Sequence, residues 1–247
     1  MKLKNAVFAA LAAVCACGCV REDDNAIRMI TEATFPPYEF LRGQEIVGID
    51  VEICRAVAKT LGKEFKCETV DFDSVIPAVI SRKADLAAAG ITITEDRKKN
   101  VDFSDPYVRT GIVMIYKKSA PYAKAEDAKG KRVGVQGGTT SETYVLEQLG
   151  QEPERFRSPA EAVAGLKAGR VDFVLADIDP AKNCVKGEDD LAISDFVTSE
   201  EYAVAIRKGQ PELLKAINDT IARVKADGSL AKWIAQYTEE ADKLKEK

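Results

Sequence analysis

The chain of 247 residues contains no histidine. This absence excludes nucleophilic systems of the Ser-His-Asp and Cys-His types, and it removes the commonest metal ligand. Positive charge is not in excess either, because 36 lysines and arginines stand against 40 acidic residues. No basic patch with interleaved aromatic residues occurs in the sequence. We therefore expect no metal, no cofactor and no nucleic-acid partner.

Long hydrophobic runs are also scarce. The apolar run at residues 6–16 has 11 residues, which is too short to cross a bilayer. It follows Lys2 and Lys4 and ends in small residues, a pattern typical of a secretory signal peptide over residues 1–16. The letters VCAC resemble a bacterial lipoprotein signal with Cys17 as the lipidated residue, and ordinary cleavage without lipid is the alternative. We expect a periplasmic or cell-envelope protein that reaches the membrane through an N-terminal lipid anchor.

Export to an oxidising compartment raises the question of disulfides. Cys54 lies on an expected helix at residues 50–62, and Cys67 lies on the strand expected at residues 64–70. A helix that folds back on its next strand can bring two such cysteines together. Two alternatives stay open, a Cys54–Cys67 disulfide and a pair of buried free thiols.

Strand and helix patterns alternate after Asn25. This alternation predicts an α/β fold with mainly parallel sheets. Two helices are expected to close the chain, after residue 211. The expected strands lie at 26–31, 64–70, 84–90, 110–118, 131–138 and 170–177, and the expected helices between them lie at 50–62, 73–83, 140–150 and 158–169.

One internal similarity indicates two lobes of like construction. The segments AVISRKADLAAAG, residues 78–90, and AGLKAGRVDFVLAD, residues 164–177, share a helix end, a basic turn, an aspartate and a buried strand. Ligands of open α/β sheets bind outside the carboxyl ends of the strands. Two facing lobes would therefore enclose a cleft lined by residues 32–35, 90–97 and 136–141 and by Asp177.

Arg97 is the main candidate for binding an anion in that cleft. It follows the strand that stops at Gly90, in the first turn of a short helix capped by Thr94. Its planar fork matches a carboxylate, and Thr92 adds a hydroxyl group. The alternative interpretation is one more exposed cation in the run EDRKK.

Asp177 is the matching candidate for an ammonium group, because it ends a buried strand. Asp179, with Pro180 after it, is expected to cap the next helix, which leaves Asp177 without a structural role. A solvated loop aspartate is the alternative. Among the aromatic residues, Tyr38 is expected in the core, whereas Phe35 and Phe72 could stack on the apolar part of a ligand.

Taken together, these segments resemble the polar amino-acid-binding proteins of ABC importers. The segments that carry the resemblance are TFPPYEF, IVGIDVEICRAVAKTLG, GKRVGVQGGTTSETY, DFVLAD and, most specifically, residues 71–107. The resemblance spans about residues 27–237. It implies a two-lobed type II periplasmic-binding-protein fold, with residues 27–110 and 204–247 in lobe 1 and residues 111–203 in lobe 2. The chain would cross between the lobes twice, near residues 109–113 and 201–205.

The resemblance also implies roles for individual residues. Arg97 would bind the α-carboxylate of an amino acid, helped by Thr92 and by the backbone at Thr140, while Asp177 and the Gly90 carbonyl would bind the α-ammonium. Phe35 and Phe72 would sandwich the ligand's side chain. Glu32 falls at the position where members of the family carry an acidic residue that recognises the ligand's side chain. Gln136 falls at the position where glutamine binders carry a lysine. Arginine or lysine is therefore favoured over glutamine as the ligand.

Three functions compete at this level. The first is a monomeric binding protein that delivers a free amino acid to an ABC-transporter permease by closing its cleft. The second is an enzyme on the same fold, similar to cyclohexadienyl dehydratase, with Glu32 as the general acid. The third is a solute sensor that acts through another protein.

Overall fold

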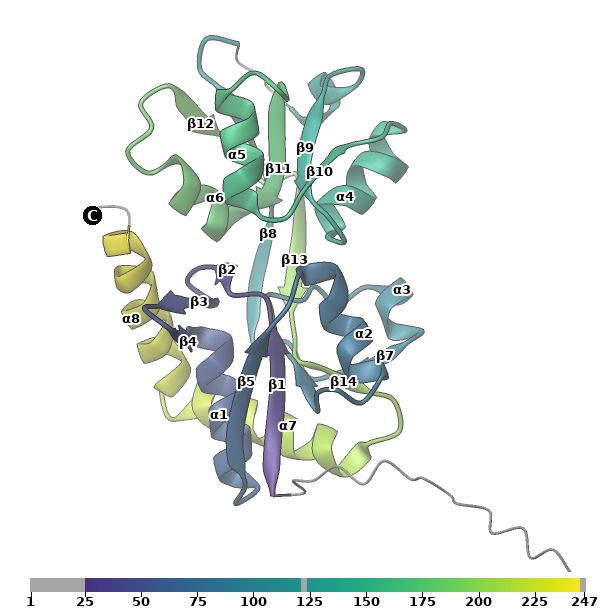
Figure 1. The fold of residues 1–247 in the computed structure, drawn as a ribbon, viewed down its shortest axis with the longest axis vertical. Coiled ribbons are helices and arrows are strands. Elements are labelled where there is room, and N and C mark those ends of the chain that lie inside the picture. Colours follow the sequence, from purple (N-terminus) through teal and green to yellow (C-terminus); the bar gives the residue numbers. More distant parts are fainter. Residues whose placement is uncertain (1–24, 121–123, 245–247) are drawn as a thin grey trace, which may run out of the picture.

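The computed structural model describes residues 25–120 and 124–244, which form two α/β lobes stacked along the long axis (Figure 1). The predicted signal peptide at residues 1–16 and the predicted lipidation site at Cys17 lie outside the described residues. In the part of the chain that is described, no helix has both the length and the apolar character needed to span a bilayer.

The first lobe, at the bottom of Figure 1, is built on a five-stranded sheet in the order β5-β1-β6-β14-β7. Strands β5, β1 and β6 run parallel, while β14 runs antiparallel to both of its neighbours. The strands are β1 (Ala26–Thr31), β5 (Glu64–Thr69), β6 (Leu86–Ala87), β7 (Val101–Phe103) and β14 (Ala205–Arg207). The small sheet beside them consists of β2 (Thr34–Phe35), β3 (Glu39–Arg42) and β4 (Glu45–Val47).

Helices of the first lobe enclose its main apolar core. The buried face of α1 packs with α7 and α8 around Ile53, Val57 and Ile221. The helical elements are α1 (Ile49–Thr60), the 3-10 turn η1 (Phe72–Ser74), α2 (Val75–Ile80), α3 (Glu95–Lys98), α7 (Pro211–Ala226) and α8 (Ser229–Leu244).

The second lobe contains a six-stranded sheet in the order β10-β9-β11-β8-β12, with β13 also paired to β8. Its strands are β8 (Val108–Lys117), β9 (Val133–Gln136), β10 (Glu154–Phe156), β11 (Phe173–Asp177), β12 (Leu191–Ile193) and β13 (Thr198–Tyr202). Its helical elements are η2 (Ala125–Ala128), α4 (Thr140–Tyr144), the π-helical turn η3 (Val145–Leu149), α5 (Pro159–Lys167) and α6 (Ile178–Val185).

Two antiparallel strands connect the lobes. β8 leaves the first lobe and β13 returns to it, with Val108 opposite Tyr202 and Ile112 opposite Thr198 (Figure 1). The two segments predicted to cross between the lobes, residues 109–113 and 201–205, overlap these strands. Because β8 and β13 bond to each other, the two connections form one paired ribbon.

The internal repeat has the same hydrogen bonds in both lobes. In the first lobe, the Asp85 amide donates to the Arg28 carbonyl at 2.9 Å, and the Arg28 amide donates to the Asp85 carboxylate at 3.0 Å. In the second lobe, Asp172 and Arg132 exchange the equivalent bonds at 2.8 and 2.9 Å. Each aspartate therefore ties the start of an inner strand to the strand beside it.

Several predicted elements are shorter in the structure. The helix expected at 73–83 is regular only over α2, because Arg82 adopts a positive φ of 64° and ends it. The strand expected at 84–90 forms ladder pairs only at Leu86–Ala87. Beyond them the backbone turns toward the other lobe, so sheet pairing gives way to the loop that carries Gly90 and Arg97.

The disulfide alternative for Cys54 and Cys67 is wrong, because both are free thiols. Cys54 is buried on the inner face of α1, and Cys67 packs against the same apolar core. Burial raises the pKa of the Cys67 thiol to about 12 and raises that of Cys54 as well. Both side chains therefore act as small, uncharged core residues.

Candidate functional site

The candidate site lies where the two lobes touch, at the carboxyl ends of β1, β6, β9 and β11. The Tyr38 hydroxyl donates to Asp179 at 2.7 Å, and the Asn183 amide donates to the Pro36 carbonyl at 2.8 Å. Both bonds join the first lobe to α6 of the second. The lobes are thus held in contact across the cleft predicted from the internal repeat.

Arg97 lies within this contact, on α3. The Thr94 hydroxyl caps the helix by accepting a hydrogen bond from the Arg97 amide at 3.1 Å, as predicted. The guanidinium donates to the Thr92 carbonyl at 2.8 Å and, across the cleft, to the Gly138 carbonyl at 3.1 Å. It also lies over the Phe72 ring, 5.6 Å from the centroid.

Arg97 differs in these contacts from the cations beside it. Lys98 and Lys99 are exposed, and they pair with Glu95 and Asp96 on their own helix. Burial lowers the pKa of the Arg97 guanidinium, against the charges of Glu200 and Asp177. Its two hydrogen bonds within the described residues leave three of its five N–H donors for a ligand.

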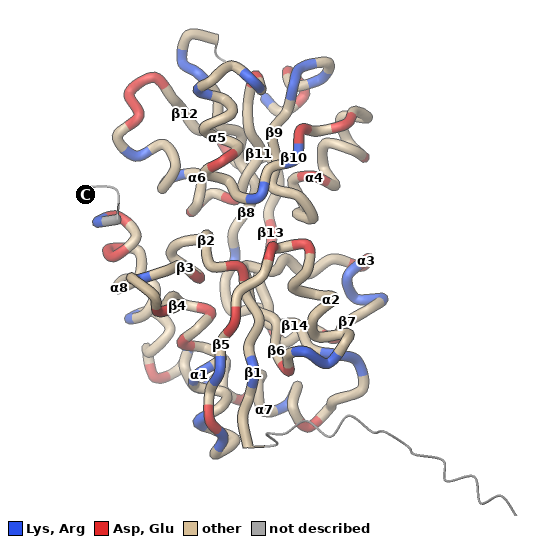
Figure 2. Tube along the Cα trace, in the orientation of Figure 1, with Lys and Arg blue, Asp and Glu red and all other residues tan. Residues whose placement is uncertain are grey.

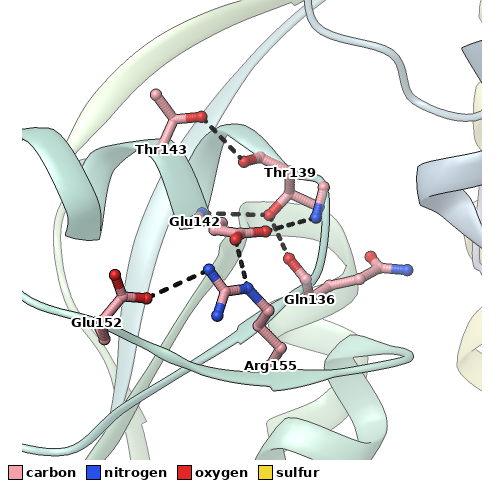
Figure 3. A network of polar contacts seen from close by, with 7 residues as sticks. Gln136, Thr139, Glu142, Thr143, Glu152 and Arg155 are labelled. Carbon is pink, nitrogen blue, oxygen red and sulfur yellow. Dashed lines mark hydrogen bonds and ion pairs between the residues drawn. The ribbon is translucent and has the colours of Figure 1, made fainter.

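The wall opposite Arg97 begins at the turn before α4 (Figure 3). The Thr139 hydroxyl accepts a hydrogen bond from the Glu142 amide and so caps α4. The Glu142 carboxylate reaches back to the Gly138 amide at 2.6 Å, one residue before the cap, and also pairs with Arg155 at 2.6 Å. These contacts hold the turn that presents the Gly138 carbonyl and Thr140 to the cleft.

Asp177 ends β11 and is 8% exposed. The Tyr202 hydroxyl donates to its carboxylate at 2.5 Å. Burial, and next the charge of Glu200, raise the pKa of Asp177 to about 8. Its side chain makes no capping bond to α6, so it is available to the cleft.

The expected role of Asp179 is wrong. Asp177, not Asp179, occupies the N-cap position, because α6 already begins at Ile178. Asp179 lies in the first turn, where its carboxylate accepts the hydrogen bond from Tyr38 of the other lobe. Its role is therefore to join the lobes.

Glu200 belongs to this site, and the sequence analysis missed it. It lies on the connecting strand β13, is 8% exposed, and accepts a hydrogen bond from the Thr92 hydroxyl at 2.6 Å. Its charge acts on both Arg97 and Asp177. Glu200 and Glu201 are adjacent in sequence. Only the alternation of side chains along a strand could have shown which of them is buried, because it turns Glu200 inward and Glu201 toward exposed Arg109.

Glu32 and Gln136 form another pair across the lobes. Glu32 follows β1, is 6% exposed, and accepts from the Thr34 hydroxyl at 2.6 Å, while its Oε2 atom has no partner among the described residues. Burial raises the pKa of Glu32, and hydrogen bonding from Thr34 and Gln136 opposes the rise. The Gln136 side chain donates to the Arg157 carbonyl at 2.9 Å. A buried carboxylate oxygen is thus left for a ligand.

Aromatic rings form the remaining wall. Phe35 packs with Tyr38 and Tyr202, with ring centroids 5.9 and 6.3 Å away. Gly90 lies against the Phe35 ring, and a Cβ atom there would come within 2.7 Å of it. Phe35 is almost fully buried, whereas Phe72 is half-buried beneath Arg97. Tyr38 belongs to the core, as predicted.

Two cavities open beside these residues. One of about 800 Å³ is lined by Thr92, Thr140 and Glu200 among others, and one of about 630 Å³ is lined by Arg97, Gly138 and Thr140 among others. Glu32, Phe35, Gly90 and Asp177 lie outside both linings. The described residues contain no group of three or more Cys, Asp and Glu side chains placed to hold a metal.

The site thus combines an arginine fork with several buried carboxyl groups, in a protein whose remaining charges are mixed in sign. Acidic and basic residues are interspersed over both lobes (Figure 2). A model of bacterial extracellular solute-binding proteins, family 3, matches residues 27–240. The chain belongs to this family.

Individual relatives agree with the family match. ABC transporter arginine-binding protein 1 of Escherichia coli is 34% identical, over 95% of this chain and 99% of its own. The L-cystine-binding protein TcyJ of the same species is 35% identical, over 81% and 77%. Two structures of an ancestral arginine-binding protein, one bound to arginine and one to glutamine, are 41% identical to this chain, with TM-scores of 0.80 and 0.79. Each match covers 86% of this chain and at least 97% of the chain in the matched structure.

These comparisons confirm the two-lobed type II periplasmic-binding-protein fold. They also bear on the competing functions, because the matched model describes solute-binding proteins and the relatives named above are binding proteins. The chain is therefore a solute-binding protein and not an enzyme.

Proposed function

We propose that this protein binds a basic amino acid, arginine or lysine, outside the cytoplasm and delivers it to an ABC-transporter permease. Arg97 binds the α-carboxylate, with Thr92 and the Thr140 backbone, and Asp177 with the Gly90 carbonyl binds the α-ammonium. Phe35 and Phe72 flank the ligand's side chain, beside Gln136. The protein acts as a monomer on a lipid anchor at Cys17. Its chain passes from lobe 1 to lobe 2 between residues 110 and 111 and returns to lobe 1 between residues 203 and 204.

The observation that carries the choice of ligand is the unpartnered Oε2 atom of buried Glu32. The site also holds one cation, Arg97, against the three carboxyl groups of Glu32, Asp177 and Glu200. Arginine and lysine bring two positive charges and one negative charge. A basic ligand therefore comes closer to neutralising the buried charges than glutamine does, and unpaired buried charges are costly.

Cleft closure follows from the same arrangement. Arg97 lies on the first lobe and Asp177 on the second, so a zwitterion contacts both only when the lobes meet. A ligand shifts a conformational equilibrium by its difference in affinity for the two states. The closed form, which a permease would recognise, is thereby favoured in the presence of the amino acid.

Glu32→Gln is expected to change the specificity of the site. The substitution removes a charge-assisted hydrogen bond, so arginine affinity should fall by about 1.5–3 kcal/mol, roughly ten- to a hundredfold. Glutamine affinity should change less than about threefold, because no ionic contact is lost. The measurement is a thermal-shift screen of the twenty amino acids with ornithine and citrulline, followed by calorimetry, on ligand-stripped protein expressed from Val20.

Glu45→Gln is the matched control, because Glu45 is an exposed carboxylate that pairs with Arg42 in the same lobe. A shift with glutamine alone would contradict the preference for basic ligands. No shift with any amino acid would contradict the proposed function itself.

Ligand affinity is expected to rise with pH up to about 8. The pKa of Asp177 is raised from 3.8 to about 8. In the ligand-free protein the Asp177 carboxyl group therefore holds a proton, which the ligand's ammonium must displace. Below pH 8, affinity should therefore rise by up to about tenfold per pH unit. The raised pKa has the opposite effect on the stability of the fold: the contribution of Asp177 to stability is full below about pH 3.8 and is lost progressively as the pH rises to about 8.

Calorimetry in buffers of different ionisation enthalpy would measure the released proton. Glu200→Gln removes the charge that, after burial, contributes most to the raised pKa of Asp177. It should therefore reduce both the slope and the proton release. A wild-type affinity that is flat from pH 6 to 8 would contradict a proton held at Asp177.

A further inference from the structure

A second group of buried acids lies behind the site, in the first lobe. The side chains of Glu39 on β3 and Asp50 on α1 are both 0% exposed. The Asp50 Oδ2 atom accepts a hydrogen bond from the Gly90 amide at 2.9 Å. Both oxygens of Glu39, Oδ1 of Asp50 and the Tyr107 hydroxyl have no hydrogen-bond partner with regular geometry among the described residues.

The backbone explains how Asp50 reaches this position. The first turn of α1 docks on the preceding loop, where the Ile49 amide donates to the Pro37 carbonyl and the Asp50 amide donates to the Tyr38 carbonyl at 3.0 Å. Gly48, with a φ of 137°, permits this approach, because a Cβ atom there would overlap the Tyr38 carbonyl. The Asp50 carboxylate is thereby held between Glu39 and Gly90.

The two carboxyl groups differ in ionisation. Burial, and next the charge of Asp50, raise the pKa of Glu39 well above its usual range. Burial raises the pKa of Asp50 to about 6, against the hydrogen bonds from the Gly90 amide and from Tyr107 and Glu39. Burial and the neighbouring charge thus favour the neutral form of Glu39, whereas the hydrogen bond from the Gly90 amide favours the ionised form of Asp50.

Gly90 needs the hydrogen bond to Asp50 because a glycine backbone does not by itself select one conformation. Its φ of 55° lies in the left-handed region, and glycine populates both signs of φ about equally. The residues after it are held by the end of β13 and the residue that follows it: the Ile93 amide donates to the Glu201 carbonyl, and the Ala203 amide donates to the Ile91 carbonyl. Asp50 holds the other end of the turn, so the direction of the Gly90 carbonyl is set from both sides.

We propose that Asp50 is a positioning residue for ligand binding: by holding the Gly90 amide, it orients the Gly90 carbonyl toward the ligand's α-ammonium. This inference rests on the proposed function of the site. Packing alone does not explain Asp50, because an apolar residue fills a buried position at lower cost than a carboxylate does. The Gly90 amide, however, requires an acceptor.

The test compares two neutral substitutions with two ligands. Asp50→Asn keeps an oxygen acceptor for the Gly90 amide, whereas Asp50→Ala removes it. The ligands are arginine and 5-guanidinopentanoate, which is arginine without its α-amino group, and each dissociation constant is measured by calorimetry. Glu45→Gln is the matched control, because Glu45 is an exposed carboxylate of the same lobe that pairs with Arg42.

Asp50→Ala should weaken arginine binding about tenfold or more and should change 5-guanidinopentanoate binding less than about threefold. Asp50→Asn and Glu45→Gln should stay within about threefold of the wild type for both ligands. Equal losses for both ligands with Asp50→Ala would overturn the proposal, because they would show a general structural defect. Wild-type protein that binds no amino acid would instead overturn the proposed function.

Amide hydrogen exchange keeps the proposal testable if Asp50→Ala does not fold. The Gly90 amide of the ligand-free wild-type protein should be strongly protected, and Asp50→Asn should retain most of that protection. Exchange of the wild-type Gly90 amide as fast as in the surface turns would show that Asp50 does not hold it. That result would overturn the proposal without any ligand.

Discussion

Arg97→Ala is expected to lower amino-acid affinity by about 3–5 kcal/mol, which is roughly a hundredfold to a few thousandfold. The substitution leaves the ligand's carboxylate buried in the cleft without its charged partner. It also removes the contact to the Gly138 carbonyl, through which Arg97 joins the two lobes. Calorimetry with arginine gives the affinity, and a melting curve without ligand shows whether the fold is kept.

A second substitution distinguishes the contribution of the planar guanidinium of Arg97 from that of its charge, and a third serves as the control. Arg97→Lys keeps the charge but loses the planar geometry that matches a carboxylate, so it should recover only part of the affinity. Lys98→Ala is the control on the same short helix, since Lys98 is exposed and pairs with Glu95. If Arg97→Ala bound arginine within tenfold of the wild type, the assignment of the carboxylate clamp would be wrong.

Asp177→Asn is expected to abolish binding without destabilising the ligand-free protein. The raised pKa keeps Asp177 largely protonated at neutral pH, so a neutral amide replaces a neutral acid, and Tyr202 keeps an acceptor. The ligand's ammonium, in contrast, loses the carboxylate that pairs with it, at a cost of about 3–5 kcal/mol. The melting temperature without ligand should be unchanged or higher, and the shift with arginine should disappear.

Asp179→Asn is the matched control for this experiment. Asp179 lies two residues further on, and its carboxylate accepts from Tyr38 of the other lobe, a bond that asparagine can also accept. It should therefore keep most of the ligand-induced shift. A large loss of stability in ligand-free Asp177→Asn would mean that Asp177 has a structural role, contrary to the view that its side chain serves the ligand.

Arg97 is predictable from the sequence and Glu200 is not, for one physical reason. Arg97 lies on a short helix, α3, shortly after a recognisable strand, and the internal repeat places the end of that strand at the cleft. Glu200 lies on a connecting strand whose pairing with β8 spans about ninety residues of chain, as between Glu201 and Arg109. Local patterns carry no information about such pairing, because the register of a strand depends on its distant partner.

Asp50 shows the same limit within one lobe. At the start of an amphipathic helix, an aspartate is ordinary, because the helix dipole favours acidic residues in the first turn. Only the docking of α1 on the Tyr38 segment, together with the turn at Gly90, makes Asp50 a fully buried acceptor. The role of Asp179 was mistaken for a related reason, since α6 begins two residues earlier than expected and leaves Asp179 in its first turn, facing Tyr38.

The sequence by itself determined the class of fold, the two-lobed organisation and the loops that reach the cleft. These follow from short-range patterns of apolar residues, from strand ends and from a repeated segment. The tertiary structure alone decided which carboxyl groups are buried together, that Cys54 and Cys67 stay free thiols, and which side chains join the lobes. Burial and ionisation depend on what lies across the sheet or across the cleft, and those neighbours are distant in the chain.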